Sequence, residues 1–227
     1  MSPTRGVQTL LLACTLWGTS AQANESSATP TREPLAFELT IQADDKDIAP
    51  WMGQHLELQR YKNLSDLDDQ EMAKLLRDAD EQARELLATQ GYFNPQLQWQ
   101  LVATPSATHL RQVDLNIDVG PLARIVAVDI RWEGDILDRP EARKQREQVL
   151  TEWVLPVGKD FSQSQWSRAK TQALRLVQAE RYPLARISDS QADVDAQTNQ
   201  VRLSITLDSG PQVHLGPLVI TGTERYS

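Results

Sequence analysis

Apolar residues along the chain follow two different periods, one typical of strands and one typical of helices. In the first block, alternation with polar residues predicts strands over 35–41, 97–101 and 113–119, and helical spacing predicts helices over 48–56 and 67–87. A polar turn connects the last two strands, so they are expected to form a hairpin. The predicted order is therefore strand, helix, helix, strand, strand.

The same order returns in a second block. Strand patterns cover 126–132, 184–194 and 201–207, and helix patterns cover 138–154 and 162–177. Tyr92 and Tyr182 both follow a long helix and lie ninety residues apart, which is also the spacing of Gly120 and Gly210. Two independent landmarks that share one spacing indicate a tandem repeat of about ninety residues.

The helix ends carry residues suited to capping. We expect Asp44-Asp45-Lys46-Asp47 to cap and charge-match the first helix, and Ser65-Asp-Leu-Asp68 to form a near capping box at the second. Gly91 is expected to end that second helix. In the second block, Ser162-Gln-Ser-Gln165 is a complete capping-box sequence.

Each block ends in a Gly-Pro pair that stands between two strands. Asp118-Val-Gly-Pro121 precedes the first strand of the second block, and Asp208-Ser-Gly-Pro211 precedes a further strand-like run. Glycine tolerates positive φ and proline stiffens the exit, so these pairs are interpreted as hinges and not as ligand sites. The predicted inter-domain seam residues are Gly120, Pro121, Gly210 and Pro211.

The seams divide the chain into domains. We predict a first domain over 35–120 and a second over 121–210. Residues 211–227 are expected to be the first strand of a truncated third domain, because a lone strand with a bare apolar face is an unusual end for a chain. The alternative is that this strand pairs with something outside the chain.

The N-terminus is typical of an exported protein. Arg5 precedes a short apolar run and Ala21-Gln-Ala23 is a small-x-small cleavage site, so 1–23 is predicted to be a signal peptide. The alternatives are a membrane anchor, for which the run is short, and a lipidated Cys14. Residues 24–34 are polar and contain two prolines, which predicts a linker.

Charge and cysteine content narrow the possible partners and the compartment. The 227-residue chain has a net charge of −8, which disfavours binding to nucleic acid or to an anionic membrane surface. Its single cysteine lies in the predicted signal peptide, so the mature chain is expected to have no disulfides and no thiol chemistry. An exported protein of this kind fits the bacterial periplasm.

The sequence contains no pattern that indicates catalysis. The three histidines lie in different predicted elements, and the acids of 44–47 suit a helix start better than acid–base chemistry. Phosphate-loop, dinucleotide-binding and nucleophile-elbow motifs do not occur. We therefore predict no enzyme activity, no cofactor and no metal. Five tryptophans are expected in the core or at domain contacts: Trp51, Trp99, Trp132, Trp153 and Trp166.

The element order and two motifs resemble polypeptide-transport-associated (POTRA) domains of the Omp85 superfamily. The motifs are Gly91-Tyr-Phe-Asn-Pro95 after the long helix and Val119-Gly-Pro121 leading into 125–134, and the resemblance covers 35–222. It implies an α+β fold of tandem POTRA domains, each with a three-stranded mixed sheet covered by two helices. The second block has Arg181-Tyr-Pro at the equivalent of the first motif, so this motif is complete only once.

Within the superfamily the chain is most similar to the TamA family, the outer-membrane subunits of translocation and assembly modules. This resemblance implies a periplasmic arm, at the outer membrane of a Gram-negative cell, that helps to assemble autotransporters and other β-barrel proteins. The implied partners are a TamB-like protein anchored in the inner membrane and nascent outer-membrane β-barrel or autotransporter proteins. Contact with the outer membrane itself would require a barrel that is not part of this sequence.

An open sheet edge is the predicted contact with these partners, because an extended peptide can add to such an edge through main-chain hydrogen bonds. In the fold that the resemblance implies, the first strand of the hairpin lies at an edge, which here means 96–102 and 184–194. The candidate partner-binding residues are Leu97, Trp99, Leu101, Leu184 and Ile187.

Three alternatives to this function stay open. In the first, the domains are a rigid spacer, which predicts that function tolerates substitutions in the edge strands but not at the seams. The other two are the POTRA region of a two-partner secretion transporter and that of the main barrel-assembly protein.

Overall fold

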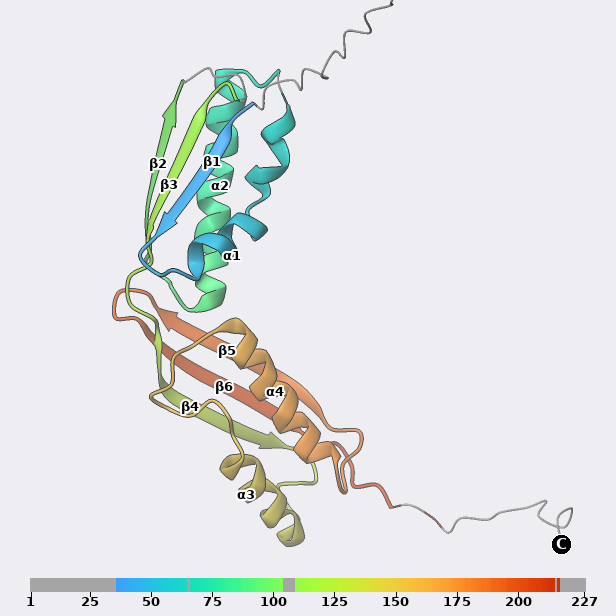
Figure 1. Cartoon of the computed structure of the whole chain (residues 1–227). Helices are drawn as coiled ribbons and strands as arrows, with labels where there is room; N and C mark the ends of the chain where they lie inside the picture. The colour runs from blue at the N-terminus through green and yellow to red at the C-terminus, as the bar shows by residue number, and fades with distance from the viewer. Residues whose placement is uncertain (1–35, 65, 104–108, 215, 217–227) are drawn as a thin grey trace, which may run out of the picture. The chain divides into compact units, whose positions relative to one another are not determined.

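The computed structural model describes residues 36–64, 66–103, 109–214 and 216 (Figure 1). The predicted signal peptide with Ala21 and Ala23, the predicted linker and most of the predicted third-domain strand lie outside these residues. Every helix within the described ranges is too short or too polar to cross a membrane.

The first sheet is built from three strands that are not in sequence order. The elements are β1 (Glu38–Ala43), α1 (Ile48–His55), the 3-10 helix η1 (Glu57–Asn63), α2 (Asp69–Gln90), β2 (Gln96–Val102) and β3 (Gln112–Asp118). The strand order is β1-β3-β2, with β1 parallel and β2 antiparallel to the central β3 (Figure 1). The sheet is therefore mixed, as predicted.

The second sheet repeats this topology. Its elements are β4 (Arg124–Glu133), the 3-10 helix η2 (Pro140–Ala142), α3 (Arg143–Thr151), α4 (Gln163–Gln178), β5 (Arg186–Asp195) and β6 (Gln200–Asp208). The order is β4-β6-β5, with β4 parallel and β5 antiparallel to β6. Both halves thus have the order strand, helix, helix, strand, strand, which confirms the predicted α+β fold class.

A separate hydrophobic core lies between the helices and one face of each sheet. In Figure 1 the helices α1 and α2 lie on the same side of the first sheet. Full burial of one large apolar side chain stabilises the fold by about 1.5–3 kcal/mol. The largest fully buried side chains are Phe37, Met52, Met72, Leu87 and Leu115 in the first core and Ile125, Ile136, Leu155, Tyr182, Leu203, Ile205 and Leu207 in the second.

The long helix α2 begins three residues later than predicted. Its N-cap is Asp68 and not Ser65, because Asp68 Oδ1 accepts the Glu71 N–H at 2.7 Å while Glu71 Oε2 accepts the Asp68 N–H at 3.2 Å. Asp68 and Glu71 therefore form a reciprocal capping box, in place of the predicted pair of Ser65 and Asp68. The end of the helix is as predicted, since Gly91 takes the left-handed conformation with φ 103°.

Two other predicted caps form only in part. Asp47 is the N-cap of α1 but its side chain makes no capping bond, and its own N–H donates to Asp45 Oδ1 at 3.0 Å. At α4, Ser162 Oγ accepts the Gln165 N–H at 3.3 Å, which is one half of the predicted box.

The predicted helix over 138–154 is wrong at both ends. The chain forms the short η2 and then α3, which ends at Thr151. The following segment is bound to β4, because Gly158 N–H donates to the Ile125 carbonyl and Ile125 N–H donates to the Lys159 carbonyl. That pairing directs the chain away from the helical path after Thr151. Two apolar residues of the predicted helix are exposed, namely Leu150 within α3 and Val154 beyond it.

A bulge changes the expected alternation in β4. Ile125 pairs with Val201 and Ala127 pairs with Arg202, so Val126 is an extra residue without a counterpart on β6. As a result Ile125 is 1% exposed and Val126 is 37% exposed. The alternation predicted over 126–132 therefore breaks at its first residue, because Val126 is exposed while Val128 packs against the core.

The tryptophans are less deeply buried than expected. Trp166 is fully within the second core. The other four described tryptophans are half-buried and pack against the outside of a core, and these are Trp51, Trp99, Trp132 and Trp153.

The two predicted seams have matching local geometry. Gly120 has φ 67° and its N–H donates to Asp118 Oδ1 at 3.1 Å, and Gly210 has φ 60° and donates to Asp208 Oδ1 at 3.0 Å. The bond from Gly210, followed by Arg186, lowers the pKa of Asp208. Each seam is thus an Asx-type turn that only glycine completes without strain.

The repeat also preserves a buried tyrosine beside an aspartate. Tyr92 and Tyr182 are 8% and 0% exposed. The Tyr92 hydroxyl donates to Asp45 Oδ2 at 3.1 Å, whereas the Tyr182 hydroxyl has no hydrogen-bond partner among the described residues. Burial, and then this hydrogen bond, raises the pKa of Tyr92, and burial followed by the charge of Asp135 raises the pKa of Tyr182.

We expect Tyr92→Phe to lower the free energy of unfolding by about 0.5–1.5 kcal/mol, because one partly buried hydrogen bond is lost. Tyr182→Phe is the matched variant. It should be neutral or slightly stabilising, because it removes a buried hydroxyl that has no hydrogen-bond partner among the described residues. Urea unfolding followed by tryptophan fluorescence measures both changes. Equal losses in the two variants would contradict this account.

A second prediction concerns two glycines with positive φ. A Cβ at Gly134 (φ 80°) would lie 2.7 Å from Ser209 Oγ and 2.9 Å from Asp208 Oδ1, while at Gly158 (φ 88°) it would meet nothing within 4 Å. Gly158→Ala should therefore cost about 1–2 kcal/mol from backbone strain alone. Gly134→Ala should cost at least about 1 kcal/mol more from overpacking. Denaturant midpoints at equal m-value measure the difference, and a smaller loss at Gly134 would refute it.

Candidate protein-binding edge

The strand β2 is hydrogen-bonded on one side only. It pairs with β3 without a break from Gln96 to Val102, and no described residue pairs with its other side. In an antiparallel strand every second residue directs its N–H and C=O away from its neighbour. Within the described part of the chain, nothing pairs with the main-chain donors and acceptors at the outer edge of β2.

Charge distinguishes this edge from the other three. Among the edge strands of the described sheets, β1, β4 and β5 each contain at least one charged residue, and β2 contains none. Proteins commonly use charges and bulges at edges to prevent unwanted strand pairing. The edge of β2 lacks both of these protections.

The edge of β5 is protected in both ways. A bulge at Ser188 interrupts its pairing with β6, and the Ser188 hydroxyl donates to Glu133 Oε2 at 2.8 Å. The strand also contains Asp189, Asp193 and Asp195. An incoming strand would meet a kinked and acidic edge here.

The helix-facing side of β2 carries the predicted residues Leu97, Trp99 and Leu101. Trp99 is held in place because its indole N–H donates to Asp80 Oδ1 at 3.0 Å. Asp80 in turn accepts from Arg84 Nε at 2.8 Å, and Arg84 Nη1 donates to the Pro95 carbonyl at 3.0 Å. The network joins α2 to the start of β2 and fixes the indole at the edge of the sheet.

A hollow of about 440 Å³ lies beside the fixed indole. Its walls are Trp99 and one side of α2, from Leu76, Arg77 and Asp80. The Asp80 carboxylate is already occupied by Trp99 and Arg84, so the indole and Leu76 supply the apolar surface. The hollow is suited to an apolar side chain.

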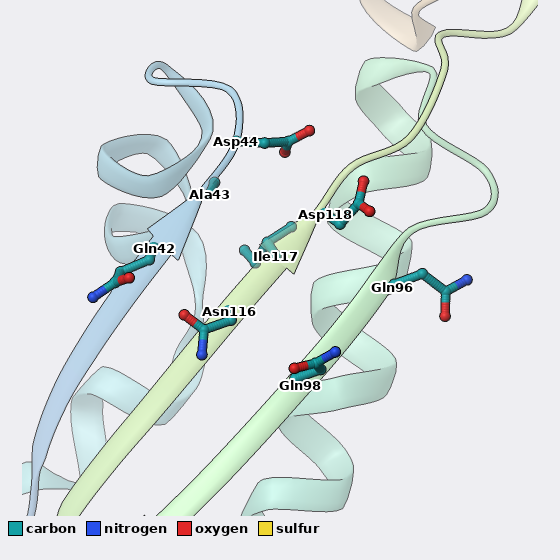
Figure 2. Close-up of a pocket in the computed structure, with 8 residues that line it drawn as sticks. All are labelled: Gln42, Ala43, Asp44, Gln96, Gln98, Asn116, Ile117 and Asp118. Atoms are coloured by element: carbon teal, nitrogen blue, oxygen red, sulfur yellow. The ribbon is translucent and has the colours of Figure 1, made fainter.

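The solvent-facing side of the same sheet is lined with amides. Figure 2 shows Gln42, Asn116 and Gln98 in a row across the three strands, which agrees with the pairing of Asn116 with both glutamines. A second hollow of about 440 Å³ lies there. Sequence reasoning missed this surface, although the polar positions of all three strands are rich in amides. Its lining residues are Gln42, Ala43, Asp44, Gln96, Gln98, Asn116, Ile117 and Asp118.

The other two candidate residues do not join this edge. Leu184 was predicted to begin a strand, but β5 starts at Arg186 and Leu184 lies before it with 66% of its surface exposed. Ile187 lies in β5, immediately before the bulge, and is half-buried against the second core. Ile187 belongs to the second sheet and Leu184 lies in the segment that precedes it, so neither residue is part of the sheet of β2.

The histidines have local partners where these are described. His55 Nδ1 lies 2.8 Å from the Trp51 carbonyl, and His109 Nδ1 lies 3.2 Å from Glu38 Oε2. Within the described residues, no group of three His, Cys, Asp or Glu side chains is arranged to hold a metal ion. The acids near α1 serve the backbone, since Asp44 Oδ1 accepts the Val119 N–H at 3.1 Å.

Comparisons with solved structures find similar folds at low sequence identity. No family model matches the sequence and no curated protein matches it. Among solved structures, POTRA3-5 of Haemophilus influenzae BamA is 16% identical, with 79% of this chain and 67% of that chain covered and a TM-score of 0.40. POTRA1-2 of Omp85 from Anabaena is 13% identical, with 79% and 99% covered and a TM-score of 0.39.

CdiB from Escherichia coli is also similar, at 11% identity and a TM-score of 0.34, with 82% of this chain but only 29% of CdiB covered. At these identities and TM-scores, the similarity neither establishes a family nor assigns a function to this chain.

Proposed function

We propose that this chain is the periplasmic POTRA region of an Omp85-superfamily outer-membrane protein, most like the TamA family. In this role the first sheet binds other proteins by adding their strands to the edge of β2. The single observation that carries the proposal is this edge, which is unpaired among described residues, uncharged and free of bulges. Main-chain pairing at such an edge makes few demands on sequence, which suits a factor with several clients.

The two repeats support the assignment to POTRA domains. Both have the order strand, helix, helix, strand, strand and the same mixed sheet, and Gly120 and Gly210 form equivalent turns ninety residues apart. The proposed partners are a TamB-like protein anchored in the inner membrane and nascent outer-membrane β-barrel or autotransporter proteins. The proposed contacts are Leu97, Trp99 and Leu101 on β2, with Leu184 and Ile187 near β5 as the alternative edge.

Leu101→Lys tests the proposal with little cost to the fold. The Leu101 side chain is 42% exposed and faces α2, so a lysine there can reach solvent until a further strand covers it. We expect the variant to lose at least about tenfold in photo-crosslinking from position 100 to the TamB-like partner and to β-barrel precursors. A tenfold loss corresponds to about 1.4 kcal/mol, the usual scale of desolvating an unpaired polar group. Crosslinking in exporting cells is the measurement.

Ala192→Lys is the matched control, since it places the same charge on the helix-facing side of β5. It should leave crosslinking unchanged. Loss of crosslinking in Ala192→Lys alone would indicate that the partner binds β5 instead of β2. If both lysine variants crosslink normally and substitutions at Gly120 and Gly210 abolish assembly, the domains act as a rigid spacer and edge binding is refuted.

A further inference from the structure

We propose that the two sides of β2 select the strand that this edge accepts. The ligand is an extended polypeptide segment of about the length of β2, which has seven residues. Apolar side chains of the segment face α2, and uncharged amide or hydroxyl side chains face the opposite side. Acidic residues on that second side are rejected. This inference rests on the proposed function, namely that a strand pairs with β2 at all.

The helix-facing side of the edge supplies apolar contacts. Side chains of a paired strand stand in register with those of its neighbour and alternate between the two faces. Residues opposite Leu97, Trp99 and Leu101 would therefore point toward α2, where the hollow between Trp99 and Leu76 lies. Trp99 is fixed by Asp80, so the hollow exists before any ligand arrives. The ligand residue opposite Trp99 is consequently apolar, and Leu97 and Leu101 favour apolar residues at the two neighbouring positions on this side.

The opposite side supplies polar and acidic neighbours. The residues of β2 on this side are Gln96, Gln98 and Gln100, and their partners on β3 are Asp118, Asn116 and Asp114. No strand of the first sheet contains Lys or Arg. Amide and hydroxyl side chains of an added strand would lie opposite the glutamines of β2 and extend the row seen in Figure 2. Carboxylates would meet no cation on the strands of this sheet, and they would add to the negative charge of Asp114 and Asp118 one strand further away.

The second sheet cannot make the same selection. At the bulge the alternation of the two faces shifts by one residue. The seven residues beyond Ser188 pair with β6 without a break, but three of their four solvent-facing positions are aspartates, which disfavour the same ligand: Asp189, Asp193 and Asp195. β2 has no such shift over its whole length. Among the edge strands of the described sheets, only β2 combines an unbroken alternation with an uncharged solvent-facing side.

Synthetic peptides test this selection directly on the full chain. The first peptide has nine residues in which Leu and Phe alternate with Thr and Gln. A second has Glu at every polar position, a third has the same composition as the first with apolar residues at helical spacing, and a fourth is the first with alternate amides N-methylated. Fluorescence anisotropy should give a Kd below about 1 mM for the first peptide and at least about tenfold weaker binding for the others.

A charge exchange on the protein locates the contact. Gln98→Lys with Gln100→Lys should bring the Glu peptide to within about threefold of the Thr/Gln peptide, because the new cations face its carboxylates. The matched control is Gln191→Lys with Asp193→Asn, which makes the same change in net charge on the corresponding side of β5. This control should leave the preference unchanged.

The outcomes distinguish a failure of strand addition from a failure of selection. If none of the peptides binds, strand addition itself fails and the proposed function falls with it. If the first peptide binds and N-methylation abolishes binding, strand addition stands. Selection is then overturned if the Glu peptide binds equally well, or if the β5 control rescues it as well as the β2 variant does.

Discussion

Each sheet depends on a central strand that is hydrogen-bonded on both sides. In β3 and β6 the apolar residues Val113, Leu115, Val201 and Leu203 are at most 2% exposed, so these strands hold the cores as well as the ladders. Three strands around one centre necessarily leave two edges. The covering helices close one face but do not pair with an edge. An unpaired edge is thus a consequence of this topology, and the side chains of the edge strand determine whether it can pair with a further strand.

The two repeats treat equivalent edges differently. β5 has a bulge at Ser188 and several aspartates, while β2 continues without a bulge or charge. Both strands occupy the same place in the same topology. The difference is therefore not needed for folding, and it concentrates the proposed binding in the first sheet. The network from Trp99 through Asp80 to Arg84 adds rigidity at that edge.

Several local features were within reach of sequence reasoning and others were not. Alternating patterns located β2 and β3, and Gly91 marked the end of α2, because these depend on neighbouring residues. The N-cap was not predicted correctly, because Ser65 and Asp68 lie three positions apart and both side chains can cap a helix. The bulge at Val126 depends on how β4 meets β6, and a single strand pattern does not contain that information.

By itself, the sequence determined the period of the repeat, the order of the elements and the absence of charge from β2, since all three are properties of the linear chain. The resemblance implied that the first strand of each hairpin lies at an edge, and the tertiary structure decided that β1 and β4 form the opposite edges. It also brought Leu76 beside Trp99, and it aligned Gln42, Asn116 and Gln98 in one row. These contacts join residues that are far apart in the chain, so they arise from register and packing and not from local preference.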